Sequence, residues 1–236
     1  MSEKMFCYKY PHPAVATDSV VFGYDGKQLH ILLIERAQGA YKGSWALPGG
    51  FIRMDETAEE GALRELAEET NVSNVYLEQF HTFTAVERDP RERVMSIAYF
   101  ALVRKSDYNV IGGDDAAKAE WYPIDRLPKL AFDHAEIIEM AKQKLQDTLR
   151  YKPIAFKLLD EKFIMSQLQK LYELINDTKY DRRNFQKKML ATGFIKDEGV
   201  CETPMQCRAP GLFSFDEEKY MEAMAQKSSC KYPFDF

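Results

Sequence analysis

Three glutamates in the first third of the chain have the spacing that a metal site on a helix requires. Glu68 and Glu69 follow Glu65 by three and four residues, so one helical face carries all three carboxylates. Like charges so close together repel one another in water. A hard dication removes this repulsion, and Mg²⁺ binds one or two carboxylates together with water and phosphate oxygens. The spacing therefore predicts a Mg²⁺ (or Mn²⁺) site at which water attacks a bound pyrophosphate.

The residues before these glutamates predict the start of the helix and a sharp turn next to the site. Thr57 stands three residues before Glu60, the spacing of a capping box. Gly49-Gly50 lets a strand turn sharply and expose backbone carbonyl groups towards the glutamates. The alternative is a solvated acidic face, which is what most glutamate-rich helices have. We favour the metal site because the whole pattern, six residues of fixed type and two aliphatic positions, occurs by chance with a probability on the order of 10⁻⁶. The six residues are Gly50, Glu56, Arg64, Glu65, Glu68 and Glu69.

The run from Gly50 to Val72 resembles the Nudix signature G-x5-E-x7-R-E-U-x-E-E-x-G-U, in which U is a bulky aliphatic residue. Asn71 stands where the family has glycine, but asparagine also adopts the left-handed conformation of a helix end. Because the signature is otherwise complete, the resemblance implies that hydrolysis has been retained. By this resemblance the catalytic residues are Glu56, Arg64, Glu65, Glu68 and Glu69, and the metal ligands are Gly49, Glu65, Glu68 and Glu69.

A charged segment after the helix, ERDPRER at residues 87–93, holds candidates for substrate binding. Its arginines could hold a phosphate by charge-assisted hydrogen bonds, and Glu87 or Glu92 could be the general base. The alternative is a solvated surface loop. A neighbouring phenylalanine could stack on adenine or belong to the core. The candidate substrate-binding residues are Arg88, Arg91, Arg93 and Phe83.

Three segments carry a wider resemblance: residues 81–103, residues 131–138 (AFDHAEII) and the C-terminal part of the chain. They resemble ADP-ribose pyrophosphatases and the Nudix-related transcriptional regulators of the NrtR type. The resemblance spans nearly the whole chain and implies ADP-ribose as the ligand, cleaved to AMP and ribose 5-phosphate where the site is active. A proline that one ADP-ribose-specific subclass carries after the signature is missing, and Val86 and Glu87 occupy that region.

The elements that position these residues predict an α+β fold, a mixed sheet flanked by helices. Asp25-Gly26 is expected to be the turn of a β-hairpin. A helix follows Thr57, and a second helix is expected from Asp133 with Glu136 as its reciprocal cap. The expected strands, rich in aromatic and β-branched residues, are residues 14–24, 29–36, 76–83, 94–103 and 120–124.

The periodic pattern of apolar residues stops and restarts around Tyr151-Lys152-Pro153, because proline disfavours helix in the residue before it. We therefore divide the chain into domains of residues 1–150 and 151–236. In the second domain we expect two helices and then the short strand-like runs FIKDEG and GLFSFD. Helix, turn, helix and hairpin is the order of a winged helix-turn-helix. The two helices are expected at residues 165–176 and 181–192.

The second of these helices carries basic and amide side chains of the kind that contact DNA phosphates and bases. The alternative is a small dimerisation or capping domain with solvated lysines. The segments KYDRRNF and QCRAPGLFSF resemble the recognition helix and the wing of the regulators. This resemblance implies double-stranded DNA as a partner and a homodimer, since such proteins commonly read paired half-sites. The candidate DNA-binding residues are Arg182, Arg183, Asn184, Gln186 and Lys187.

Composition and charge indicate where the protein acts and which kinds of partner it can bind. The N-terminus lacks the pattern of a signal peptide, and no run approaches the roughly 20 apolar residues of a membrane span, so we expect a cytoplasmic protein without a membrane partner. The four cysteines show no paired metal-ligand spacing. Residues 1–150 hold 18 basic and 24 acidic residues, a net charge of −6, whereas residues 151–236 hold 14 and 13, a net charge of +1. The second domain therefore does not repel a polyanion.

Two functions from different classes fit these features. One is an active pyrophosphatase with a DNA-binding tail, and the other is a ligand-sensing transcription factor whose first domain mainly senses. Regulators that only sense often have eroded glutamates, so the complete set here favours turnover. The two roles can coexist, because hydrolysis would remove an effector that shifts a dimer between DNA-competent and incompetent arrangements.

Overall fold

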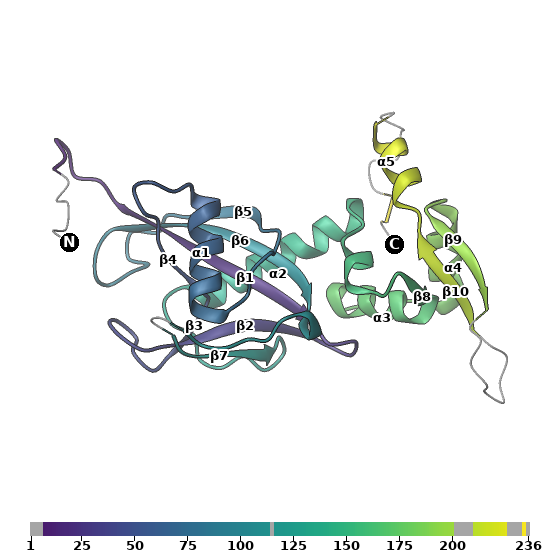
Figure 1. Ribbon diagram of the computed structural model, residues 1–236, viewed down its shortest axis with the longest axis horizontal. Coiled ribbons are helices and arrows are strands. Elements are labelled where there is room, and N and C mark those ends of the chain that lie inside the picture. Colours follow the sequence, from purple (N-terminus) through teal and green to yellow (C-terminus); the bar gives the residue numbers. More distant parts are fainter. Residues whose placement is uncertain (1–6, 114–115, 201–209, 226–232, 235–236) are drawn as a thin grey trace.

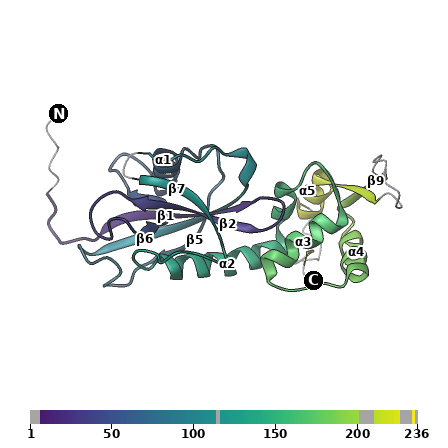
Figure 2. The same ribbon diagram turned by 90° about the horizontal axis from the view of Figure 1, so that it is seen from below.

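The computed structural model describes residues 7–113, 116–200, 210–225 and 233–234. One part of the molecule contains a large sheet with a helix on each face, and the other part is mostly helical (Figures 1 and 2). Helix α2 (His134–Tyr151) runs along the sheet and ends at the helical part. The predicted α+β class is confirmed.

In the described part of the chain, seven strands form one mixed sheet with the order β3-β2-β1-β6-β5, to which β4 and β7 add by pairing with β1 and β2. β1 and β6 pair in parallel from Ala14 with Val94 to Tyr24 with Arg104, and the other pairs are antiparallel. The predicted hairpin of β1 and β2 is confirmed, and its turn residue Gly26 has a φ of 85°. The strands are β1 (Ala14–Tyr24), β2 (Leu29–Arg36), β3 (Trp45–Ala46), β4 (Gly49–Phe51), β5 (Glu78–Phe83), β6 (Val94–Arg104) and β7 (Ala116–Pro123).

Helix α1 (Ala58–Thr70) begins and ends as its sequence predicts. The Thr57 hydroxyl accepts a hydrogen bond from the Glu60 N–H at 3.2 Å, and the Glu60 carboxylate accepts one from the Thr57 N–H at 2.7 Å. At the other end Asn71 takes the left-handed conformation with a φ of 59°. Its N–H donates to the carbonyl of Ala67. The turn therefore persists with asparagine in place of glycine.

Helix α2 covers the face of the sheet opposite α1 (Figure 2) and begins after Asp133, as predicted. Its buried face includes Ile137, Ala141 and Leu145, which belong to the main apolar core. The predicted reciprocal cap with Glu136 is wrong, because no side chain caps this helix. The Asp133 carboxylate instead forms an ion pair with Arg88.

The second part of the chain contains both predicted helices and the predicted hairpin. α3 and α4 pack through Tyr172 and Phe185, whose ring centroids are 5.4 Å apart. This part also contains a three-stranded antiparallel sheet with the order β8-β10-β9. The sequence analysis predicted neither the first strand of this sheet nor the last helix of the chain. The elements are β8 (Lys162–Ile164), α3 (Met165–Asn176), α4 (Arg182–Ala191), β9 (Ile195–Val200), β10 (Gly211–Phe215) and α5 (Glu217–Ala225), with short 3₁₀ helices at Lys105–Asp107 and Ile154–Leu158.

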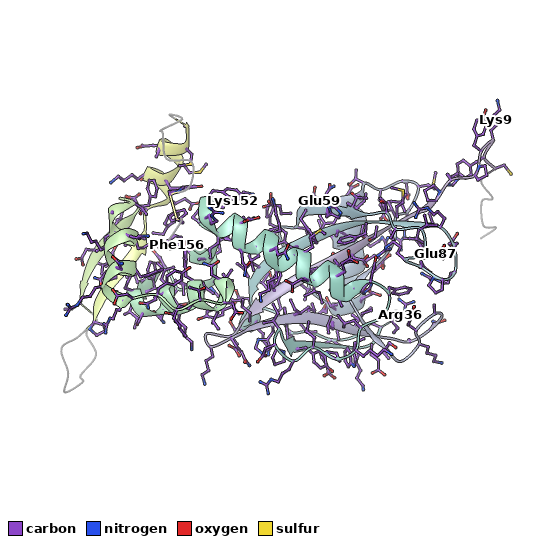
Figure 3. All side chains as sticks on the ribbon, turned by 180° about the vertical axis from the view of Figure 1, so that it is seen from behind. Lys9, Arg36, Glu59, Glu87, Lys152 and Phe156 are labelled. Carbon is purple, nitrogen blue, oxygen red and sulfur yellow. The ribbon has the colours of Figure 1, made fainter. Side chains whose placement is uncertain are left out.

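The two parts share one apolar core. A single cluster of buried side chains runs from the sheet through Leu149 of α2 and Phe156 to α3 and α4. Lys152 and Phe156 mark the place where α2 meets the second part (Figure 3). The ammonium of Lys152 lies 2.6 Å from the carboxylate of Glu78, and Arg104 donates to the carbonyl of Leu159. Within the described residues, no helix is both long and apolar enough to cross a membrane.

Candidate functional site

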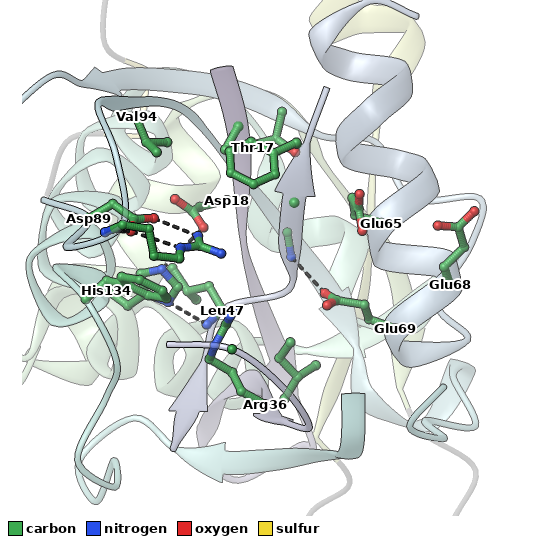
Figure 4. Close-up of a pocket in the computed structure, with 18 of the residues that line it drawn as sticks. Thr17, Asp18, Arg36, Leu47, Glu65, Glu68, Glu69, Asp89, Val94 and His134 are labelled. Atoms are coloured by element: carbon green, nitrogen blue, oxygen red, sulfur yellow. Dashed lines mark hydrogen bonds and ion pairs between the residues drawn. The ribbon is translucent and has the colours of Figure 1, made fainter. Parts of the chain in front are cut away.

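A cavity of about 390 Å³ lies between β4, helix α1 and the start of α2 (Figure 4). Glu65, Glu68 and Glu69 of α1 form one wall. Asp18 of β1 and His134 of α2 form the opposite wall. The structure therefore brings the three predicted glutamates to the same cavity.

Two glycines of β4 allow the strand to approach both neighbours closely. A Cβ atom on Gly49, whose φ is 157°, would overlap the carbonyl oxygen of Thr17. A Cβ atom on Gly50 would lie 2.5 Å from a carboxylate oxygen of Glu65. The N–H of Gly49 donates to the Glu69 carboxylate at 2.9 Å. A side chain at Gly49 would displace β4 from β1, whereas one at Gly50 would push the Glu65 carboxylate aside.

The guanidinium of Arg64 binds three carboxylates at once. Its Nε and Nη2 atoms donate to the two oxygens of Glu56 at 2.9 and 2.6 Å. Its Nη1 atom donates to Glu65 at 2.7 Å and to Glu68 at 3.0 Å. The hydrogen bonds from Arg64 lower the pKa of Glu56 to about 2, so Glu56 is ionised at neutral pH. Arg64 thus fixes the loop before α1 against the helix.

Burial acts in the opposite direction on Glu65. Desolvation raises the pKa of the Glu65 carboxyl above its ordinary value although Arg64 is bonded to it. The residue Glu69 is buried as well, with 6% of its surface exposed. The Coulomb attraction between a carboxylate and a cation is stronger in such partly dry surroundings than in water.

The donor chemistry of this wall fits a hard dication, since carboxylate oxygens are the ligands that Mg²⁺ prefers. Among the residues that the structure describes, no group of three His, Cys, Asp or Glu side chains lies close enough together to hold a metal ion as the side chains stand. The glutamates instead accept hydrogen bonds from the protein itself. Glu65 and Glu68 accept from Arg64, and Glu69 accepts from the Gly49 N–H. An ion bound here would replace some of these contacts.

A buried ionic network forms the wall opposite the glutamates. The Arg88 side chain, only 5% exposed, donates to both carboxylate oxygens of Asp133 at 2.9 and 2.7 Å. It also donates to Asp18 at 3.2 Å. The hydroxyl of Ser96 donates to the same Asp18 oxygen at 2.5 Å. Arg88 therefore joins the loop after β5 to β1 and to the start of α2, and Asp18 extends the network to β6.

His134 completes this network in its neutral form. Its Nδ1 atom accepts a hydrogen bond from the Leu47 N–H at 2.8 Å, so the ring proton lies on Nε2, which is 3.4 Å from Asp18. Burial lowers the pKa of His134 below its ordinary value. The ring is therefore neutral at physiological pH, with its Nε2–H beside the Asp18 carboxylate.

The four predicted substrate-binding residues divide into two pairs. Arg88 and Arg91 line the cavity, whereas Phe83 and Arg93 do not. Phe83 is buried in the main core, and Arg93 donates to the carbonyl oxygens of Thr84 and Ala85 at 2.9 Å. The two residues that were considered for the general base, Glu87 and Glu92, are exposed and lie outside the cavity lining (Figure 3 shows Glu87).

Sequence reasoning missed the two partners of Arg88, Asp18 and Asp133, and it missed His134 beside Asp18. The signal for Asp18 was present, because Thr17-Asp18-Ser19 interrupts an otherwise apolar strand and all three residues are buried. A buried carboxylate needs a partner, so such an interruption indicates an ion pair or a functional site.

The residues predicted to bind DNA gather on the outer side of α4. Phe185 and Met189 point into the core of the second part. The Asp181 carboxylate accepts from the Asn184 N–H at 2.9 Å and caps the helix. Residues 206–209 of the segment that resembles the wing lie outside the described residues. Of the candidates on α4, Arg182, Arg183, Asn184 and Lys187 are exposed and Gln186 is partly exposed.

Comparison with known proteins identifies both parts. Residues 12–141 match the NUDIX domain family, and residues 155–215 match the NrtR DNA-binding winged helix domain. The chain belongs to the Nudix family. The predicted fold, a Nudix fold followed by a winged helix-turn-helix, is confirmed by these matches.

Three relatives illustrate the family. The ADPR responsive transcriptional repressor NtrR of Acinetobacter baylyi is 32% identical over 80% of this chain and 76% of its own length. The ADP-ribose pyrophosphatase of Methanocaldococcus jannaschii is 42% identical over 55% of this chain and 73% of its own. Shewanella oneidensis NrtR complexed with a 27mer DNA has a TM-score of 0.69 and 28% identity, covering 88% of this chain and 95% of that one. Its NUDIX domain complexed with ADP ribose has a TM-score of 0.53 and 36% identity over 58% and 90%.

Removing Arg88 should destabilise the fold, because Asp18 and Asp133 would be left buried without a cation. We expect Arg88→Ala to lower the free energy of unfolding by about 3–5 kcal/mol. Arg126→Ala, which removes an exposed arginine paired with exposed Asp125, should cost less than about 1 kcal/mol. Urea denaturation of both variants checks this. Equal stability of the two would show that the network does not hold the fold.

Proposed function

We propose that the chain is a Mg²⁺-dependent (or Mn²⁺-dependent) pyrophosphohydrolase that cleaves ADP-ribose to AMP and ribose 5-phosphate. The observation that carries this proposal is the complete set of signature glutamates, Glu65, Glu68 and Glu69, facing one cavity. The similarity to an ADP-ribose pyrophosphatase and to an ADPR responsive repressor supports ADP-ribose as the ligand.

Each signature residue has a role in this proposal. Glu65, Glu68 and Glu69, with Gly49, would hold the ion, which when bound neutralises the pyrophosphate and activates water. Arg64 holds Glu65 and Glu68 at hydrogen-bond distance and is itself fixed by the ionised Glu56. These two residues set the geometry of the carboxylates before substrate enters, and such preorganisation is worth more in a partly dry cavity than in water.

We propose that the second domain binds double-stranded DNA and that the protein acts as a homodimer. The exposed basic and amide side chains on α4 support DNA binding, and paired half-sites call for two copies. We place the domains at residues 1–150 and 151–236, because α2 ends at Tyr151 and the two family matches end and begin on either side. ADP-ribose would then be both substrate and effector.

The alternative is a sensor that binds ADP-ribose without significant hydrolysis. The resemblance of most of the chain to an ADPR responsive transcriptional repressor favours this function. Turnover distinguishes the two, because both functions require ligand binding.

Replacement of one metal ligand tests the enzyme. We expect Glu69→Gln to lower kcat for Mg²⁺-dependent release of AMP from ADP-ribose by at least about 100-fold, since the amide loses the charge but can still accept from the Gly49 N–H. Glu59→Gln, an exposed residue of the same helix outside the cavity lining, is the matched control and should keep full activity. Unchanged turnover in Glu69→Gln would refute the assignment of the metal site.

Charge removal on α4 tests the DNA contact. Arg183→Ala with Lys187→Ala should weaken binding to mixed-sequence double-stranded DNA and reduce the slope of log K against log salt by about 2. Lys118→Ala with Arg126→Ala removes the same charge from exposed sites on the first domain and should change neither quantity. Fluorescence anisotropy at several salt concentrations measures both. An intact slope in the α4 variant would exclude this helix as the DNA contact.

A further inference from the structure

The end of helix α2 that lies away from the cavity is bound by residues from much later in the chain. The last carbonyl groups of a helix have no partner within the helix itself. In α2 the carbonyl of Arg150 accepts from the Phe234 N–H at 3.0 Å, and that of Tyr151 accepts from the Tyr220 hydroxyl at 3.2 Å. The same helix begins at His134, which lines the ligand cavity. One end of α2 therefore belongs to the cavity, and the other end is held by these later residues.

The ring of Phe234 is buried in an aromatic cluster formed by Phe156, Phe194 and Tyr220. Only 1% of the surface of Phe234 is exposed. Its ring centroid lies 5.9 Å from that of Phe156, 6.1 Å from that of Phe194 and 6.1 Å from that of Tyr220. Aromatic pairs at such distances stabilise a structure beyond the burial of their surface. Phe234 is thus held by its ring as well as by its N–H.

The aromatic cluster joins the elements between which a signal from the cavity would have to pass. Phe156 belongs to the 3₁₀ helix that follows α2, Phe194 comes shortly after the end of α4, and Tyr220 belongs to α5. Close-packed interiors are hardly compressible and transmit a displacement. A shift of the end of α2 therefore acts through the ring of Phe234 on the segment that follows α4.

Phe234 and helix α5 lie outside residues 155–215, the range that matches the winged helix domain. The matched range already contains α3, α4 and all three strands of the small sheet. The residues after 215 are therefore additional to this domain. Their hydrogen bonds to Arg150 and Tyr151 attach them to the end of α2.

We propose that Phe234 is an anchor that fixes the end of α2 to the DNA-binding domain and transmits the state of the ligand cavity to α4. This inference rests on the proposed function and adds the contact through which ADP-ribose acts on DNA binding. A ligand shifts an equilibrium only by binding two arrangements unequally, so the cavity and α4 must change together. Without the anchor the cavity still binds and hydrolyses its ligand, but α4 no longer responds to it.

Loss of the anchor should separate hydrolysis from the control of DNA binding. In Phe234→Ala, and in a variant that lacks residues 226–236, kcat/KM for ADP-ribose with Mg²⁺ should remain that of wild type. Saturating ADP-ribose without Mg²⁺ should change the affinity of wild type for mixed-sequence double-stranded DNA by roughly 5- to 150-fold, and this factor should fall to about 1 in both variants. Fluorescence anisotropy measures the affinity. Met221→Ala, which alters an exposed residue of α5, is the matched control and should keep the wild-type factor.

A conservative replacement separates coupling from simple loss of stability. Phe234→Leu keeps an apolar side chain and the N–H, so it should retain most of the wild-type factor. Phe234→Ala should lower the melting temperature by roughly 6–20 °C, because it empties a buried aromatic site. All binding is therefore measured well below the melting temperature of each variant.

Three results would count against the anchor. A wild-type factor in both Phe234→Ala and the deletion variant would overturn it while the proposed function stands. Loss of hydrolysis together with the factor would also overturn it, because the segment would then support the cavity itself. A wild-type protein that hydrolyses ADP-ribose but whose DNA binding does not respond to it would overturn the anchor and the effector role together.

Discussion

The arrangement of the site depends on one guanidinium group that holds several carboxylates at close range. Glu56, Glu65 and Glu68 all bond to Arg64, and without this cation the repulsion between carboxylates would favour their separation. The same contact ties the loop after β4 to helix α1. A face of high negative charge density, which a dication requires, can therefore exist in the folded protein before any ion binds. The glycines of β4 let the strand lie directly against this face.

A second cation performs the corresponding task on the other side of the cavity. Arg88 is buried between Asp18 and Asp133, so it connects the central strand β1 to the first turn of α2. Helix α2 continues from the cavity to Tyr151, where the carbonyl accepts from the hydroxyl of Tyr220 in α5. The apolar core is also continuous along this path. The ligand cavity and the helix that carries the basic side chains thus belong to one packed body.

The features that the sequence predicted are those that neighbouring residues determine. The capping box at Thr57, the left-handed end at Asn71 and the bounds of α3 follow from local hydrogen bonds and from the spacing of apolar residues. The Nudix signature is local as well, and it led to the wall of glutamates. The fold class and both domain types could be predicted because each domain of this chain contains several such local patterns.

The features that the sequence did not predict depend on distant partners or on very short elements. Arg88 bonds to Asp18 and Asp133, which are 70 and 45 residues away along the chain. The periodicities of helices and strands relate only residues a few positions apart, so they cannot predict such a contact. The same pairing diverted Asp133 from the helix cap that its position suggested. Strand β8 has only three residues, too few for a periodic pattern. Arg93 looked like its neighbours in sequence, but its carbonyl partners direct it away from the cavity.

We propose that one cavity both hydrolyses ADP-ribose and controls the DNA-binding domain. The most direct test follows the fraction of labelled double-stranded DNA bound to the full-length protein after a single addition of ADP-ribose, with and without Mg²⁺, while AMP is measured in the same samples. We predict that bound DNA falls on addition, returns at the rate of AMP release when Mg²⁺ is present, and stays low when the metal is removed. DNA binding that does not respond to ADP-ribose, or that responds identically with and without Mg²⁺, would contradict the account.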